Sequence, residues 1–490
     1  MQADAQPTAA NSERYPRPRL LIAALSVVAL TVAILQTAVV PVLGVISHQL
    51  NASTVAVSWA VTANLLAAAA ATPLIGRLAD LHNKKRVLLG VLVIVLAGSV
   101  LAATTASLPL LILARVLQGV SYALYPICVA ILRDELPEKR IVGALAVLSG
   151  TLGFGGGTGL VVTGLLMDGD AGYHRVFWLT TGFTVMVILV VLLVVPSRNR
   201  SATGTIDWLG AFGLAVGLTA LLLTITQGNS WGWVSPATIG SAAAGFAVLV
   251  GWWFWERRCE YPLVSITTLT RRAMLLTNIA TVFVGMGLYF GFLGLTEFVQ
   301  IPREIAGYGF SASVLHASVF YLLPGAVTGF ITATASGRFI DRLGARPVLV
   351  CGAAAGIAGF TFLAVAHSQP WQVIVAGIGA NAYISLAYGA LPAMVVNEAN
   401  AGETGVATGV NAIARTVGSS VAAALVAVLL QRSTGATGVP AEGAFVVIFA
   451  IGAVTAALAL VLIALSHTRG RTVESAEATV DSRAMNHEWG

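Results

Sequence analysis

The chain consists of long apolar runs separated by short polar segments. Fourteen such runs cover residues 20–44, 54–76, 87–106, 108–132, 141–166, 176–195, 207–226, 236–255, 273–298, 311–335, 347–366, 371–394, 404–430 and 443–466. About 20 helical residues cross the hydrocarbon core of a bilayer, whereas a membrane β-strand alternates polar and apolar residues over about ten positions. The continuous runs therefore predict an all-α membrane protein with 14 transmembrane helices.

Composition makes the lipid bilayer the expected partner. Hydrophobic residues make up 57% of the chain and charged residues 10%, against about 25% charged residues in soluble domains. The cysteines, Cys128, Cys259 and Cys351, form neither a disulfide framework nor a zinc-type spacing. We therefore expect no metal and no cofactor.

The basic residues predict the orientation. With the N-terminus in the cytoplasm, the cytoplasmic segments contain 22 of the 27 lysines and arginines, and the outer loops contain three. Cytoplasmic loops normally carry such an excess, so topology accounts for the net charge of +6 and no nucleic acid is expected. An even number of helices places both termini in the cytoplasm, and the polar tails 1–19 and 467–490 are predicted to lie there, the second of them disordered.

A short motif occurs twice, 261 residues apart. The first copy contains Gly76, Asp80 and Arg86, and the second contains Gly337, Asp341 and Arg342. The repeat predicts a six-helix bundle over 20–200, a two-helix insertion over 201–272 and a second six-helix bundle over 273–466. Transporters built from paired bundles bind their substrate between them, near the middle of the membrane.

Six local patterns occur in a fixed order along the chain. They are Trp59 to Ala63, Gly76 to Arg86, Arg115 to Gly119, Asp207 to Gly210, Glu256 to Arg258 with Pro262 to Val264, and Gly405 to Asn411 with Arg415 and Gly418. Together they resemble the fourteen-helix drug:proton antiporter branch of the major facilitator superfamily, over roughly residues 20–466. The resemblance implies a major-facilitator fold in a bacterial inner membrane. It also implies proton-coupled export of hydrophobic or amphipathic drugs, and thus multidrug efflux and antibiotic resistance.

Several positions depart from the pattern of that branch. Gln36 stands where an acidic residue is usual, and Asn64 stands where a tyrosine is usual. The loop motif has Leu81 and Asn83 in place of arginine and glycine, and the segment 150–159 is rich in glycine but has no proline. These departures affect the expected proton site and drug specificity rather than the fold.

Glu297 is the only acidic residue within an apolar run, near the outer end of the ninth. Ionisable groups inside a membrane usually face a bundle interior or water, so Glu297 is a candidate for proton coupling, with His316 as a possible partner. The alternatives are a solvated carboxylate at the outer interface, paired with Arg303, and a histidine that is merely hydrogen-bonded. Arg115 either tunes a nearby proton-accepting group or donates hydrogen bonds to backbone carbonyls of a neighbouring helix.

The two repeated motifs are predicted to act as gates. Gly76 and Gly337 would let helix ends approach closely, while Asp80 and Asp341 would pair with basic neighbours or with a helix N-terminus, where an anion is favoured. Such contacts form in one conformation and break in the other. The alternative is that the charged residues of these motifs only set the orientation of the helices in the membrane.

The central cavity is expected to be mostly apolar and to take a lipophilic small molecule, because few charges lie within the runs. The polar groups expected to line it are Gln36, Asn64, Gln118, Tyr289, Asn381, Tyr388 and Arg415. For Arg415, the alternative is a side chain that extends to the cytoplasmic interface.

Three other functions remain open. An uncoupled facilitator, or an exporter of an endogenous metabolite or lipid, also fits the sequence. A sensor or assembly partner without transport is a further alternative. The sequence contains no Gly-x-x-x-x-Gly-Lys-Ser/Thr loop, so an ATP-driven pump is not expected. It contains no nucleophile–base pair in any loop, so an enzyme is not expected either. The protein is expected to be a monomer.

Overall fold

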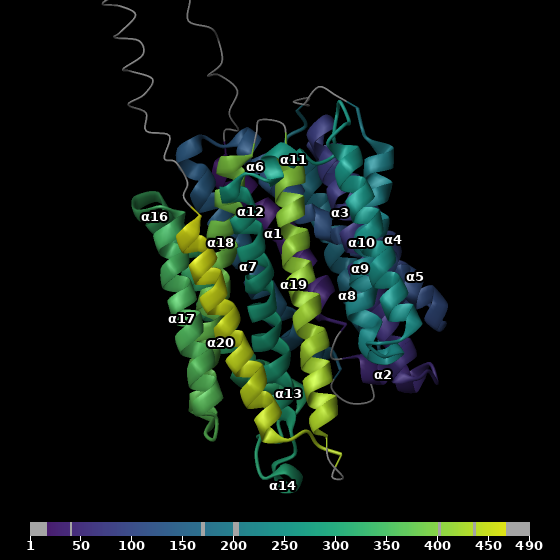
Figure 1. Ribbon diagram of the computed structural model, residues 1–490, viewed down its shortest axis with the longest axis vertical. Helices are drawn as coiled ribbons and strands as arrows, with labels where there is room; N and C mark the ends of the chain where they lie inside the picture. The colour runs from purple at the N-terminus through teal and green to yellow at the C-terminus, as the bar shows by residue number, and fades with distance from the viewer. Residues whose placement is uncertain are drawn as a thin grey trace, which may run out of the picture.

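A computed structural model describes residues 17–39, 42–167, 172–198, 205–399, 403–434 and 438–466. All elements in these ranges are helices, and fourteen of the helical segments are long and apolar enough to cross a membrane, which confirms the predicted number. The protein is thus a multi-pass membrane protein (Figure 1). The elements are α1 (Pro18–Thr37), α2 (Leu43–Gln49), α3 (Thr54–Leu81), α4 (Lys84–Thr104), α5 (Leu108–Gly119), η2 (Val120–Ala123), α6 (Leu124–Glu135), α7 (Glu138–Leu166), α8 (His174–Val194), α9 (Trp208–Trp231), α10 (Pro236–Glu256), α11 (Ile266–Leu269), α12 (Arg272–Tyr289), η3 (Phe290–Gly294), α13 (Leu295–Gln300), α14 (Arg303–Ala306), α15 (Val314–His316), η4 (Ala317–Leu322), α16 (Leu323–Leu343), α17 (Ala345–Val365), α18 (Pro370–Glu398), α19 (Thr404–Ser433) and α20 (Glu442–Leu465).

Three of the spans contain a change of helix type that the hydropathy pattern did not predict. A 3₁₀ turn, η2, separates α5 from α6, and the π-helical turns η3 and η4 lie within the ninth and tenth spans. A π turn places one extra residue in a helical turn, and such turns occur frequently at functional sites.

Local chemistry accounts for several helix starts. The side chain of Asn83 accepts a hydrogen bond from the backbone N–H of Arg86 and so caps α4. Asp207 caps α9 in the same way, and Ser235 caps α10. Capping side chains satisfy backbone donors that have no partner within the helix. Asn83, which departs from the resembled motif, therefore has a local structural role.

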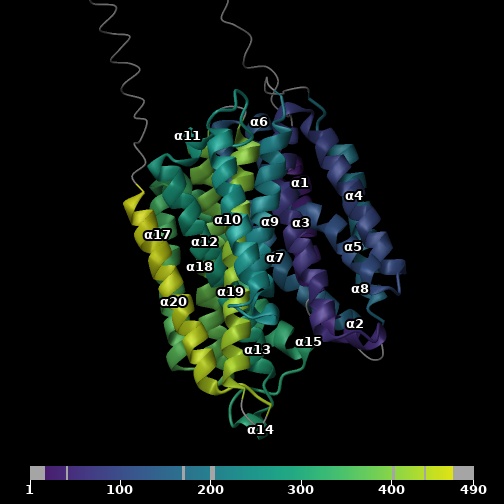
Figure 2. The ribbon, with the colours of Figure 1, turned by 45° about the vertical axis from the view of Figure 1, so that its right-hand side comes forward.

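The first six spans contact the last six mainly where α7 packs on α16 and α18, and where α3 and α6 pack on α19. Helix α9 lies against both α3 and α19, and α10 packs on α9 (Figure 2). A Cβ atom built on Gly76 in α3 would lie 2.9 Å from the Gly405 oxygen in α19, and one built on Gly337 in α16 would lie 2.8 Å from the Gly143 Cα in α7. The two repeated glycines thus occupy equivalent contacts, each between a helix of the first six spans and a helix of the last six.

The start of α4, which carries Lys84, and the end of α6, which carries Arg133, lie at one end of the molecule, near the start of α19. The start of α1 and the end of α20 lie at the same end (Figure 1). We call this end the basic face and the other end the opposite face. The positive-inside rule predicts that the basic face is cytoplasmic.

Candidate functional site

A cavity of about 510 Å³ lies among the helices. Its lining comes from the first six spans, from α9 and from the last six spans. The polar and aromatic lining residues are Gln36, Thr37, Ser58, Thr62, Asn64, Arg115, Tyr122, Thr226, Asn229, Ser230, Tyr289, Phe292, Asn381, Ser385, Tyr388, Arg415 and Ser420. Most of the remaining lining residues are leucine, alanine and glycine, so the wall is largely apolar, as the sequence predicts.

The cavity extends from mid-membrane to the opposite face. Lining residues in α3 begin at Ser58, close to the opposite-face end of that helix, and stop at Leu65. In α19 they run from Arg415, eleven residues from the helix start, to Ala427 near its end. At about 1.5 Å per residue, more than 15 Å of α19 separates Arg415 from the basic face.

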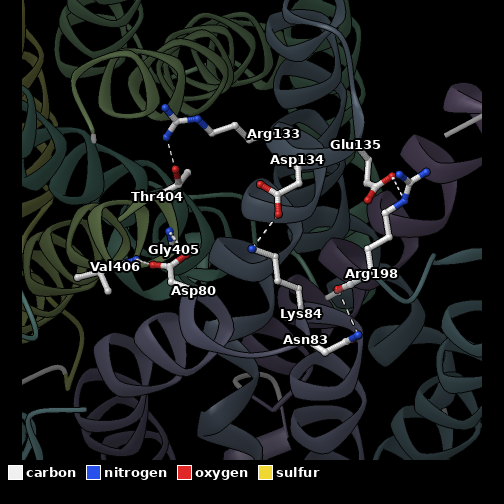
Figure 3. Close-up of polar contacts among 10 residues, drawn as sticks. All are labelled: Asp80, Asn83, Lys84, Arg133, Asp134, Glu135, Arg198, Thr404, Gly405 and Val406. Carbon is white, nitrogen blue, oxygen red and sulfur yellow. Dashed lines mark hydrogen bonds and ion pairs between the residues drawn. The ribbon is translucent and has the colours of Figure 1, made fainter. Parts of the chain in front are cut away.

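The basic face is closed by contacts between the two groups of six spans (Figure 3). The buried carboxylate of Asp80 at the end of α3 accepts hydrogen bonds from the backbone N–H groups of Gly405 and Val406, each at 3.1 Å. These N–H groups belong to the first turn of α19, where a negative charge is favoured. Arg133 adds a second link, because it donates to the hydroxyl of Thr404 and to the carbonyl of Ala399.

The basic residues Arg86 and Arg342 of the repeated motifs differ from Asp80. The side chains of Arg86 and Arg342 are exposed. The side chain of Asp341 lies outside the described residues. Lys84 forms an ion pair with Asp134 at 2.8 Å, so this basic residue joins α4 to α6 within the first six spans (Figure 3).

Arg115 is almost completely buried, with 1% of its surface exposed. Its guanidinium donates to the carbonyls of Ala60 at 3.1 Å and Leu35 at 3.3 Å, and to the side-chain oxygen of Gln118 at 2.6 Å. The Arg115 carbonyl in turn accepts a hydrogen bond from Asn64. Arg115 therefore links α5 to α1 and α3 through hydrogen bonds to backbone carbonyls. Such bonds are the second of the two roles that the sequence suggests for Arg115.

Arg415 lies on the cavity wall. Its guanidinium carbon is 4.7 Å from the ring centroid of Tyr388 and 5.6 Å from that of Tyr125. A guanidinium at these distances from an aromatic face is attracted by the ring quadrupole. The two rings hold the cation at mid-depth, and its side chain does not extend to the basic face.

Most of the expected cavity residues do line the cavity. Gln36, Asn64, Tyr289, Asn381 and Tyr388 belong to its wall, together with Arg415. Gln118 does not; it is fully buried behind Arg115 and donates to Ser99 in α4 at 2.9 Å. Sequence reasoning missed Tyr122, a polar aromatic within a span, and the three residues of α9, which no motif indicated.

Of the three expected proton-coupling residues, Arg115 belongs to the cavity wall, whereas Glu297 and His316 lie outside it. Glu297 in α13 and His316 in α15 are exposed, and neither belongs to the lining residues. His316 contacts the ring of Phe320 at 4.5 Å between centroids. Among the lining residues that the structure describes there is no aspartate and no glutamate. The two charged residues of the described wall are Arg115 and Arg415.

The Asp80 contact predicts the effect of replacing this residue by asparagine. The asparagine amide has a single, uncharged acceptor oxygen, whereas the carboxylate accepts one N–H group with each of its two oxygens. Hydrogen bonds to charged groups stabilise by about 1.5–3 kcal/mol. Asp80→Asn should therefore open the basic face in at least tenfold more molecules. Spin labels at the exposed positions Arg86 and Arg342 should show a larger population of long distances. Glu260→Gln, on an exposed loop, is the control; an unchanged distance distribution in Asp80→Asn would contradict the role.

A sequence profile of the Major Facilitator Superfamily matches residues 25–423. An uncharacterized MFS-type transporter of Mycobacterium tuberculosis is 31% identical over 416 residues, which cover 82% of this chain and 58% of that relative. The chain thus spans less than two thirds of the length of this relative.

Two further relatives and one solved structure show the same kind of match. The tetracenomycin C resistance and export protein of Streptomyces glaucescens is 28% identical, with 86% of this chain and 77% of the relative covered. The uridine/deoxyuridine transporter of Lactococcus lactis is 27% identical, with 76% and 79% covered. The crystal structure of a human organic anion transporter superposes with a TM-score of 0.62 at 14% identity, over 92% of this chain and 100% of that chain, which shows a shared fold.

Proposed function

Because this chain belongs to the major facilitator superfamily, and is thus a transporter rather than an enzyme, we propose that it exports hydrophobic or amphipathic small molecules by alternating access. The cavity that extends to the opposite face, together with the closed basic face, carries this proposal. We place the protein in a bacterial inner membrane with the basic face in the cytoplasm. The relative named for tetracenomycin C resistance and export supports the direction and the substrate class.

The contacts at the basic face have the form that alternating access requires. The carboxylate of Asp80 in α3 accepts hydrogen bonds from backbone groups at the start of α19, so the contact breaks when these helices separate. Closure of one face and opening of the other then expose the same cavity to the two sides in turn. We propose a six–two–six division of the helices, with 20–200 and 273–466 as the moving bundles.

The function is tested by transport in proteoliposomes. The purified chain is reconstituted, a pH gradient is imposed, and the flux of cationic, neutral and anionic lipophilic dyes is compared with that in protein-free liposomes. We expect flux of at least one dye that rises with the gradient and falls when a protonophore removes it. Absence of protein-dependent flux for every dye would overturn the proposed function.

We propose proton exchange as the driving force, with Glu297 as the group that carries the proton. Glu297 lies two residues beyond Leu295, a lining residue that directly follows the π turn η3. A shift of this turn would transmit a change of charge on Glu297 to the wall of the cavity. Glu297→Gln should abolish the response of flux to the pH gradient while expression stays intact.

The control for this variant is Glu304→Gln, since Glu304 is an exposed acid in the adjacent α14. It should respond to the gradient as the unmodified protein does. Full gradient-driven transport by Glu297→Gln would show that the proton is carried elsewhere.

An uncoupled facilitator is the second candidate function. The absence of a carboxylate among the described lining residues favours it, because a cavity without a titratable acid does not itself exchange a proton for substrate. The same proteoliposome experiment separates the two functions. Flux that follows only the substrate gradient, at equal rates with and without a pH gradient, identifies the facilitator.

A further inference from the structure

The charges of the cavity wall are not balanced within the described chain. Arg115 and Arg415 both line the cavity, and no acidic side chain lines it among the described residues. The guanidinium of Arg115 already has three oxygen acceptors. Arg415 has none in the part of the chain that the structure describes, where its guanidinium contacts only the rings of Tyr125 and Tyr388.

Further donors surround the same space. The hydroxyl-bearing side chains of Tyr122, Tyr289 and Tyr388 belong to the wall, and none of these hydroxyls donates to an acceptor within the described ranges. A tyrosine hydroxyl donates one hydrogen bond and a guanidinium has five N–H donors. The polar part of the cavity therefore presents donors and positive charge to whatever occupies it.

We propose that the transported molecule is an amphipathic anion whose oxygen-bearing head group, a carboxylate or a sulfonate, is bound by Arg415. This inference rests on the proposed transport function and names the substrate class of the same cavity. The aromatic rings keep the guanidinium in place, so that its N–H groups are free to contact the head group. The leucine and alanine side chains of the wall, such as Ala423, Ala424 and Ala427, would contact the apolar body.

Four physical arguments support this assignment. A cation in an apolar cavity is costly unless it is paired, and an anionic substrate would supply the missing partner. The planar guanidinium matches a carboxylate or sulfonate with two parallel hydrogen bonds. Aromatic stacking orients the guanidinium in advance, so that less conformational freedom is lost on binding. An anion that leaves a cell with a negative interior also moves down its electrical gradient.

The test uses three probes with the same aromatic body and different charges. Pyrenebutyrate is anionic, pyrenebutanol is neutral and pyrenebutyl-trimethylammonium is cationic. Their binding to the full chain in lipid nanodiscs is measured by the ligand-induced rise in Tm, and their flux is measured in proteoliposomes. We expect pyrenebutyrate to bind at least tenfold more tightly than pyrenebutanol, and the cation to bind more weakly than either.

Two variants and a control assign the preference to Arg415. Arg415→Gln should reduce the preference for pyrenebutyrate over pyrenebutanol to less than threefold while the affinity for pyrenebutanol is unchanged. Arg415→Lys should retain part of the preference, because a point charge remains without the fork. Arg432→Gln removes an exposed arginine near the opposite-face end of α19 and should behave like the unmodified protein.

Equal affinity for the three probes, or a preference for the cation, would overturn the inference. So would a preference for the anion that persists in Arg415→Gln. If the unmodified protein bound none of the probes, the inference would also be overturned. Protein-dependent flux of neutral or cationic dyes in any of these cases would leave the proposed export function in place, so the two failures are distinguishable.

Discussion

Replacement of Gly76 by valine should lower transport at least tenfold. A Cβ atom at this position would lie 2.9 Å from the carbonyl oxygen of Gly405, and the obstacle is backbone, which cannot rotate away. Overpacking of a tight contact costs about 1–3 kcal/mol, and this cost falls only on the conformation with a closed basic face. Transport requires both conformations, so the variant should accumulate with the basic face open.

Gly90 provides the matched control for this variant. It lies in α4, on an exposed surface, and an added Cβ atom there would meet no atom within 4 Å. Gly90→Val should transport at the unmodified rate, whereas Gly76→Val should show long spin-label distances across the basic face. Unimpaired transport by Gly76→Val would show that the approach of α3 to α19 is not part of the transport cycle.

The transmembrane helices could be predicted from the sequence because each run must satisfy its own backbone in lipid. The sequence predicts fourteen spans, and the described residues contain fourteen. The π turns η3 and η4 could not be predicted, since hydropathy is insensitive to a single extra residue in a turn. The cap that Asn83 provides for α4 could have been recognised from its position before a helix start.

The cavity was predictable in part. Single polar residues within apolar runs, such as Asn381 and Tyr388, indicated the wall correctly. The sequence does not indicate which face of a helix points inward, and so Gln118, which is buried behind Arg115, was misplaced. The contribution of Asn229 in α9 was missed, because it depends on the packing of α9 against α3 and α19.

The proton site was the least predictable part. The sequence favours Glu297 because it is an acid within an apolar run, but its side chain is exposed and lies outside the described lining. Its position near the end of a span left the surroundings undetermined. Contact of Asp80 with a helix N-terminus is one of the two alternatives that the sequence predicts. The structure shows that this helix is α19.

Replacement of Arg115 by alanine should destabilise the first six spans and abolish transport. The variant leaves the carbonyls of Leu35 and Ala60 and the side chain of Gln118 without their donors. A buried acceptor left unsatisfied costs about 1–3 kcal/mol. Three such losses should lower the Tm of the nanodisc-embedded protein by many degrees, and the widened contact between α1, α3 and α5 should distort the cavity wall.

Arg115→Lys separates the geometry of the guanidinium from its charge. A lysine keeps the positive charge of the cavity but has a compact ammonium group that does not reproduce the fork. Since Arg115 acts through contacts with two other helices, α1 and α3, and with Gln118 in its own helix, we expect the lysine variant to recover little of the lost Tm and little transport. Full recovery by lysine would show that the charge of Arg115 matters and its ties do not. Full recovery would also mean that the charge at position 115 is available to the substrate. Binding of the anionic head group would then have to be assigned to both Arg115 and Arg415.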